Sequence, residues 1–113
     1  MLSKKHRLTK REDFSIIYSK GSYVERDGFA IKYLQTGQSV TRIGFSVGKN
    51  FSKRAVRRNR ARRILQETCR IYMQLLKPGF DIIVILRPGH EDIEFAKAKD
   101  VLKQIFLKAN LFI

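Results

Sequence analysis

Residues 53–63 read KRAVRRNRARR, a run that places seven basic residues in eleven positions without a single carboxylate. From residue 28 to residue 66 the chain holds ten Lys or Arg and no Asp or Glu. The run continues into residues 64–72, where apolar side chains recur at helical spacing, so the charge belongs to a folded helix. Such a helix favours phosphate backbones, because counterion release from a polyanion supplies most of the binding free energy.

The composition predicts one folded domain with a polyanionic partner. The chain has 113 residues, a hydrophobic fraction of 43% and a formal net charge of +14. A domain of this length buries roughly 65% of its unfolded surface. Repulsion among so many like charges falls when an anionic partner neutralises them. We therefore expect a single RNA-binding domain over residues 1–113, with residues 1–8 forming a basic arm that is mobile unless it is bound.

Nothing in the sequence indicates a membrane or secreted protein. The longest apolar run, residues 82–86, is too short to span a bilayer, and the N-terminus has no hydrophobic signal segment. The single cysteine, Cys69, falls in mid-helix and cannot form an internal disulfide. We expect a cytoplasmic protein that makes no membrane contact.

Periodicity and turn residues predict the element order αβββαβα. Thr9 followed by Glu12 fits a capping box, so a first helix is expected from Lys10 to a stop at Gly21. The other expected elements are two strands over residues 23–35 broken at Asp27-Gly28, a strand over 41–48, a helix over 53–76, a strand over 80–86 and a helix over 94–110. This order is typical of an α+β sandwich of one four-stranded sheet and three helices.

The third strand alternates between large apolar and small residues. Ile43, Phe45 and Val47 point to one face, and Gly44, Ser46 and Gly48 point to the other. A face of small residues is either a surface that another backbone approaches closely or an ordinary solvated face. The expected core includes Phe45, Val47, Ile64, Leu65, Val84, Leu102 and Ile105.

The long helix should be apolar on one stripe in its second half and basic all round in its first half. The stripe consists of Ala61, Ile64, Leu65, Thr68, Ile71, Tyr72 and Leu75. Continued toward the N-terminus, it meets basic residues, and these cannot all be buried because each unpaired buried charge costs several kcal/mol. The helix start must therefore overhang the sheet or border an open groove, where its free N–H groups also face phosphates.

The search for catalytic residues finds no candidate. His6 falls in the arm and His90 in a turn, without the spacing of metal ligands. The carboxylates are scattered, except for a patch at Glu91, Asp92 and Glu94 that begins a helix, as the helix dipole favours. We expect neither a catalytic residue nor a metal site in the chain.

Residues 58–65, RNRARRIL, resemble the signature helix of the bacterial ribonuclease P protein subunit. The resemblance extends to Arg7-Leu8 before the first helix, to the aromatic pair Phe14 and Tyr18, and to RIGFSVGK over residues 42–49. It covers essentially the whole chain. Three departures are Arg62, where the family usually has Lys, Asn50, where a second Lys is common, and Gln66-Glu67, where the family has Arg-Glu or a similar pair.

The resemblance implies a small basic protein that binds a large catalytic RNA and with it removes the 5′ leader of precursor tRNA, as an endoribonuclease. It implies that the RNA performs the hydrolysis and holds the magnesium ions, and that the protein binds no cofactor and no small-molecule substrate. It also implies a monomer in a 1:1 complex with the RNA. The expected fold contains a left-handed βαβ crossover, whereas the general rule predicts a right-handed one.

Two sets of residues carry the expected recognition. The set for the catalytic RNA is Lys53, Arg54, Arg57, Arg58, Asn59, Arg60, Arg62 and Arg63, with the stem of Arg63 as the candidate for a purely structural role. The set for the leader groove is Phe14, Tyr18, Lys32, Ser46, Lys49 and Asn50. An exposed aromatic ring would stack on an unpaired base, and packing of both aromatics onto the sheet is an equal alternative.

Two other functions compete with this one. A ribosomal or assembly protein would bind structured RNA without belonging to any enzyme, and composition does not exclude it. A helix-turn-helix protein would bind DNA, but the long helix follows a strand and has no partner helix immediately before it.

Overall fold

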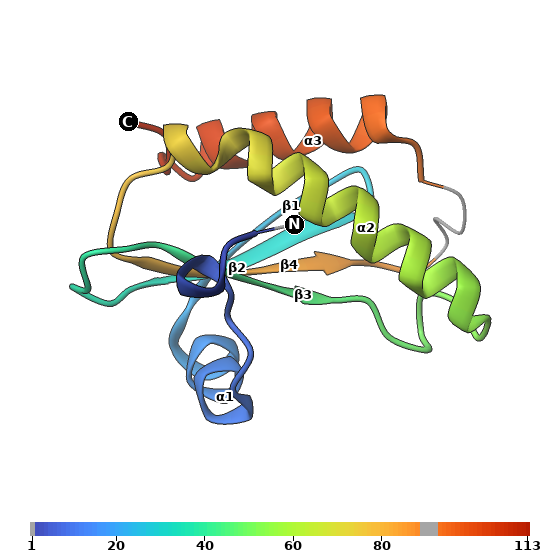
Figure 1. The fold of residues 1–113 in the computed structure, drawn as a ribbon, viewed down its shortest axis with the longest axis horizontal. Coiled ribbons are helices and arrows are strands. Elements are labelled where there is room, and N and C mark those ends of the chain that lie inside the picture. Colours follow the sequence, from blue (N-terminus) through green and yellow to red (C-terminus); the bar gives the residue numbers. More distant parts are fainter. Residues whose placement is uncertain (1, 89–92) are drawn as a thin grey trace.

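The structure, a computed structural model, describes residues 2–88 and 93–113 and has three layers (Figure 1). Helix α1 (Arg11–Lys20) covers one face of a four-stranded sheet, and α2 (Ala55–Tyr72) and α3 (Phe95–Lys108) cover the other. The strands are β1 (Ser22–Arg26), β2 (Phe29–Gln35), β3 (Arg42–Ser46) and β4 (Phe80–Leu86). Short 3-10 helices, η1 (Lys4–His6) and η2 (Met73–Leu75), complete the chain. The predicted order αβββαβα is confirmed. Gly89, His90, Glu91 and Asp92, with the turn and acidic patch expected there, lie outside the described residues.

The sheet order is β1-β2-β4-β3, so the apolar strand β4 lies inside the sheet as its composition predicts. It pairs antiparallel with β2 and parallel with β3, to which α2 connects it. The left-handed sense of this crossover remains an expectation from the resemblance. Asp27 (φ 50°) and Gly28 (φ 82°) adopt the left-handed conformation that a tight β1–β2 hairpin requires.

The main core fills the space between the sheet and the helices α2 and α3. Leu65, Val84 and Leu102 are completely buried, and Val47 and Ile105 are nearly so. Five of the seven predicted core residues are thus confirmed. The prediction is wrong for Phe45 and Ile64, which are half-buried and pack against the edge of this core.

The buried stripe of α2 is rotated from the predicted one. It consists of Ala61, Leu65, Thr68, Cys69 and Tyr72. Ile71 and Leu75, predicted to be buried, are 37% and 53% exposed, because the stripe is centred toward Cys69 and the α-helix gives way to η2 after Tyr72. The Tyr72 hydroxyl donates to the Lys99 carbonyl (2.8 Å), which ties α2 to α3.

Replacing Val84 with Ala tests the placement of this core. Val84 is fully buried on the central strand, so its truncation leaves a cavity and should lower the free energy of unfolding by about 2 kcal/mol. Urea denaturation measures this loss. RNA binding by the folded variant should stay unchanged, and a selective RNA-binding defect at unaltered stability would contradict the assignment of Val84 to the core.

The N-terminal arm is packed, which corrects the expectation of a mobile segment. Leu2 and Leu8 are buried, and the Leu8 N–H donates to the Ile43 carbonyl (2.9 Å). The His6 Nδ1 lies 2.9 Å from the Thr41 carbonyl oxygen. The arm therefore follows the free edge of β3, whose unpaired backbone groups would otherwise face solvent.

The start of α1 also differs from the prediction. The N-cap is Lys10 and makes no side-chain capping bond, so Thr9 and Glu12 do not form the expected capping box. Instead, Arg42 on β3 binds Asp81 on β4 through two hydrogen bonds (2.9 and 2.6 Å) and lies 3.5 Å from Asp13 of α1. This ion-pair network fixes the helix to the sheet without a cap.

Candidate nucleic-acid interface

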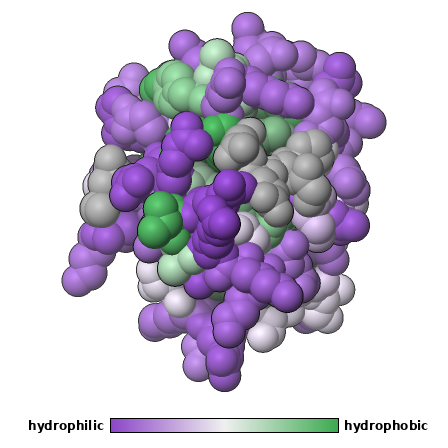
Figure 2. Space-filling model, turned by 90° about the vertical axis from the view of Figure 1, so that its right-hand side faces the viewer, coloured by the Kyte–Doolittle hydropathy of each residue, from purple (hydrophilic) through white to green (hydrophobic). Residues whose placement is uncertain are grey.

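The first turns of α2 extend past the ends of β3 and β4, as the charge pattern requires (Figure 1). Lys53, Arg54, Arg60 and Arg63 are exposed, and none has a side-chain partner among residues 2–88 and 93–113. A hollow of about 430 Å³ at the helix start is lined by Lys49, Asn50, Phe51, Ser52, Lys53, Arg54 and Arg57. Figure 2, which faces this end of the molecule, shows mostly hydrophilic residues. This surface offers several cations to one polyanion at once.

Two arginines of the basic run instead make hydrogen bonds inside the protein. Arg62 donates to the Val47 carbonyl (2.7 Å) and to Asn59 Oδ1 (3.0 Å), and Arg58 donates to the Ser52 carbonyl (3.0 Å). These bonds hold the β3–α2 loop against the helix. The structural role predicted for Arg63 thus falls to Arg58 and Arg62, while Arg63 is exposed.

The register of the strands defines rows of side chains on the face that α1 covers. One row is Tyr23, Lys32, Ile83 and Gly44, and the next is Glu25, Ala30, Ile85 and Ser46. Lys32 therefore shares a face with the small residues Gly44 and Ser46 of β3. Helix α1 lies over the first row, where Ile17 packs on Ile83.

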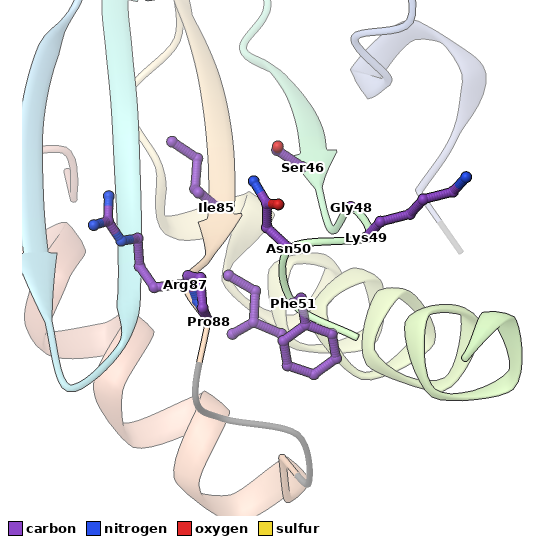
Figure 3. A pocket seen from close by; sticks show the side chains of 9 residues that line it. Ser46, Gly48, Lys49, Asn50, Phe51, Ile85, Arg87 and Pro88 are labelled. Carbon is purple, nitrogen blue, oxygen red and sulfur yellow. The ribbon is translucent and has the colours of Figure 1, made fainter. Parts of the chain in front are cut away.

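The second row is left partly open beside the β3–α2 loop. A hollow of about 400 Å³ there is lined by Ser46, Gly48, Lys49, Asn50, Phe51, Ile85, Leu86, Arg87 and Pro88. Figure 3 shows the Asn50 side chain directed between the ends of β3 and β4, while Lys49 points away from the hollow. Three predicted groove residues, Ser46, Lys49 and Asn50, are thus brought together, next to the basic start of α2.

The two aromatics of α1 have different surroundings. Phe14 is half-buried and packs in a small cluster with Leu8 and Ile17, over Gly44. Tyr18 is 41% exposed, and its carbonyl accepts a hydrogen bond from Lys32 Nζ (2.6 Å). Packing thus accounts for Phe14, whereas the ring of Tyr18 is exposed on α1 and does not line the hollow at Ser46 and Asn50.

Arg87 also lines the hollow and was missed by sequence reasoning. Its position two residues after Ile85 indicates the face to which it points, but the proximity of β4 to Ser46 and Lys49 depends on the strand order. That order is a tertiary feature with no local signal in the sequence.

Within residues 2–88 and 93–113, no three His, Cys, Asp or Glu side chains lie together as a metal site would need. Burial raises the pKa of the Cys69 thiol to about 12, so it stays protonated and is a poor nucleophile. In the same part of the chain, every helix is too short or too polar to cross a bilayer.

This chain is similar to known proteins in sequence and in fold over nearly its full length. A family model described as Ribonuclease P matches residues 2–110. The ribonuclease P protein component of Picosynechococcus is 33% identical over 111 residues, covering 98% of this chain and 96% of the relative. That of Dictyoglomus thermophilum is 36% identical over 109 residues, covering 95% and 90%.

Solved structures give the same result. The RNase P protein of Staphylococcus aureus superposes with a TM-score of 0.85 at 28% identity, covering 96% of this chain and 98% of that one. The Thermotoga maritima RNase P protein gives 0.81 at 27% identity, covering 90% and 96%. The chain therefore belongs to the family of bacterial ribonuclease P protein components, subunits of the ribonucleoprotein endoribonuclease that processes the 5′ leader of precursor tRNA.

Proposed function

We propose that this chain acts in the holoenzyme by binding two RNAs with two adjoining surfaces. The basic start of α2 binds the catalytic RNA, through Lys53, Arg54, Arg57, Arg60 and Arg63. The groove beside it binds the single-stranded 5′ leader of precursor tRNA, through Tyr18, Lys32, Ser46, Lys49 and Asn50. The observation that carries the proposal is the open hollow at Ser46, Lys49 and Asn50, directly beside exposed cations of α2.

The division of roles follows from the chemistry of each surface. A helix with cations on several sides can reach several backbone segments of a folded RNA, and each contact releases counterions. The groove instead has a cation, Lys49, at its rim, and α1 supplies an exposed aromatic ring, Tyr18. Both suit an unpaired strand whose bases stack. Asn59, Arg58 and Arg62 support this arrangement by holding the loop that joins the two surfaces.

Hydrolysis belongs to the RNA in this proposal. The catalytic RNA holds the magnesium ions, and the protein contributes positioning of the leader and electrostatic attraction in a 1:1 complex in the cytoplasm. Membership of the ribonuclease P family favours this function over a ribosomal or assembly role.

Replacing Tyr18 and Lys49 with Ala tests the groove. Both side chains are exposed, so the protein should keep its stability while the holoenzyme loses affinity for precursor tRNA by about fivefold or more, the effect of one lost stacking contact. Affinity for mature tRNA, which lacks a leader, should not change. Equilibrium binding of both substrates to the reconstituted holoenzyme measures the difference.

The matched control replaces Ile16 and Lys20, which lie about 200° round α1 from Tyr18. This pair removes one exposed apolar side chain and one charge from the same helix, and it should leave both affinities unchanged. Equal losses on precursor and mature tRNA in the Tyr18 and Lys49 variant would overturn the groove assignment.

A further inference from the structure

The groove has a far end at β1 that the proposed leader site does not use. The row Glu25, Ala30, Ile85 and Ser46 crosses all four strands on the α1 face. Since neighbouring strands lie about 4.8 Å apart, this row is about 14 Å long. The basic start of α2 adjoins its β3 end, so a strand of RNA that enters there and crosses the sheet leaves at β1.

Three side chains form a connected cluster at that far end. The Tyr23 hydroxyl donates to Glu25 Oε1 (2.8 Å), and Arg87 Nη1 lies 3.5 Å from the same hydroxyl. Arg87 Nε lies 3.9 Å from Glu25 Oε2. Arg87 also lines the hollow beside Ser46, and Figure 3 shows it directed from the end of β4 toward β2. The cluster is therefore continuous with the groove.

The cluster is open to solvent in the way that a nucleotide site requires. Tyr23 is 44% exposed, and its hydroxyl is held, which limits rotation of the ring. Partial burial, followed by the hydrogen bond to Glu25, raises the pKa of Tyr23, so the hydroxyl stays protonated as the donor. An aromatic ring beside a guanidinium group can bind a base by stacking and the adjoining phosphate by charge.

We propose that Tyr23 and Arg87 form a second leader-nucleotide site at the β1 end of the groove, in which Tyr23 stacks on a base, Arg87 contacts a phosphate and Glu25 holds both side chains. This inference rests on the proposed function and extends it. Its consequence is a dependence on leader length, because only a leader long enough to cross the sheet reaches the site.

The experiment measures holoenzyme affinity for precursor tRNAs whose leaders are shortened one nucleotide at a time. On long leaders, Tyr23→Ala should weaken binding about fivefold or more, the effect of one stacked base. Arg87→Ala should weaken it about two- to fivefold, the range of an exposed ion pair. Both defects should disappear below one common leader length, and Tyr23→Phe, which keeps the ring, should bind much as the unaltered protein does.

Arg26→Ala is the matched control for charge. Arg26 lies on the same strand as Tyr23 and Glu25. Its side chain points to the opposite face of the sheet, where it lies beside α3. It should have no effect at any leader length. An equal loss in this control would attribute the Arg87 effect to net charge and overturn the site.

Two further outcomes separate this inference from the proposed function. If Tyr18→Ala with Lys49→Ala impairs leader binding and Tyr23→Ala does not, the second site is absent while the groove stands. If neither variant loses affinity for precursor tRNA relative to mature tRNA, the assignment of the groove as the leader site is itself wrong. A Tyr23→Phe defect as large as that of Tyr23→Ala would exclude stacking and also overturn the inference.

Discussion

Replacing Arg60 and Arg63 with Ala should weaken binding of the catalytic RNA about tenfold and flatten its salt dependence by about two units of slope. Both side chains are exposed and have no partner within residues 2–88 and 93–113. Their charges are therefore available to phosphates, and each lost contact removes one set of released counterions. Filter binding of the RNA over a series of monovalent salt concentrations measures both quantities.

The control for this prediction removes the same charge from another helix. Lys97 and Lys103 are exposed on α3, and their replacement by Ala should leave the salt slope unchanged. The melting temperature of the Arg60 and Arg63 variant should also stay the same, because neither side chain makes a hydrogen bond within residues 2–88 and 93–113. A salt slope that stays unchanged in that variant, or falls equally in the control, would show that α2 is not the contact surface.

The order of the elements was predictable because its signals are local. The hairpin follows from Asp27-Gly28, and the interior position of β4 follows from its continuous apolar run. The mobile arm was predicted wrongly for a tertiary reason. A basic composition does not reveal that Leu2 and Leu8 are buried and that the backbone of the arm pairs with the edge of β3.

The basic character of the candidate site was predictable from the sequence. Which of its arginines bind the protein itself and which remain exposed was not. The basic run over residues 53–63 could be read from the sequence, but the run alone could not separate Arg62, which binds the Val47 carbonyl, from the exposed Arg63. That difference depends on the path of the β3–α2 loop. Likewise, Arg87 and Tyr23 join the groove only because β4 and β1 lie where the strand order puts them.

Gly44 gives the clearest case of a sequence feature whose meaning depends on tertiary structure. The alternation on β3 predicted a face open either to another chain or to solvent, and at Gly44 the chain's own helix covers it instead. A Cβ atom there would lie 2.4 Å from the Phe14 ring and 2.9 Å from the Leu8 carbonyl oxygen. The absence of a side chain therefore lets α1 and the arm approach the sheet.

Replacing Gly44 with Ala should accordingly lower the free energy of unfolding by about 3 kcal/mol, at the upper end of overpacking effects. The ring of Phe14 can move, but the Leu8 carbonyl belongs to a backbone that is hydrogen-bonded to Ile43, so the strain cannot be relieved by one rotamer change. Urea denaturation measures the loss of stability. Because α1 carries Tyr18, affinity for precursor tRNA should fall in the same variant.

Gly48→Ala is the matched control for Gly44→Ala, since the two glycines have the same parity and differ in what lies above them. A Cβ atom at Gly48 meets no other atom within 4 Å, so its addition should leave stability unchanged. Phe14→Leu combined with Gly44→Ala should recover part of the lost stability by freeing space above the strand, while the contact with the Leu8 carbonyl prevents full recovery. Equal stabilities for Gly44→Ala and Gly48→Ala would mean that α1 does not pack against β3 as described, and the wall of the groove would then have to be assigned to other residues.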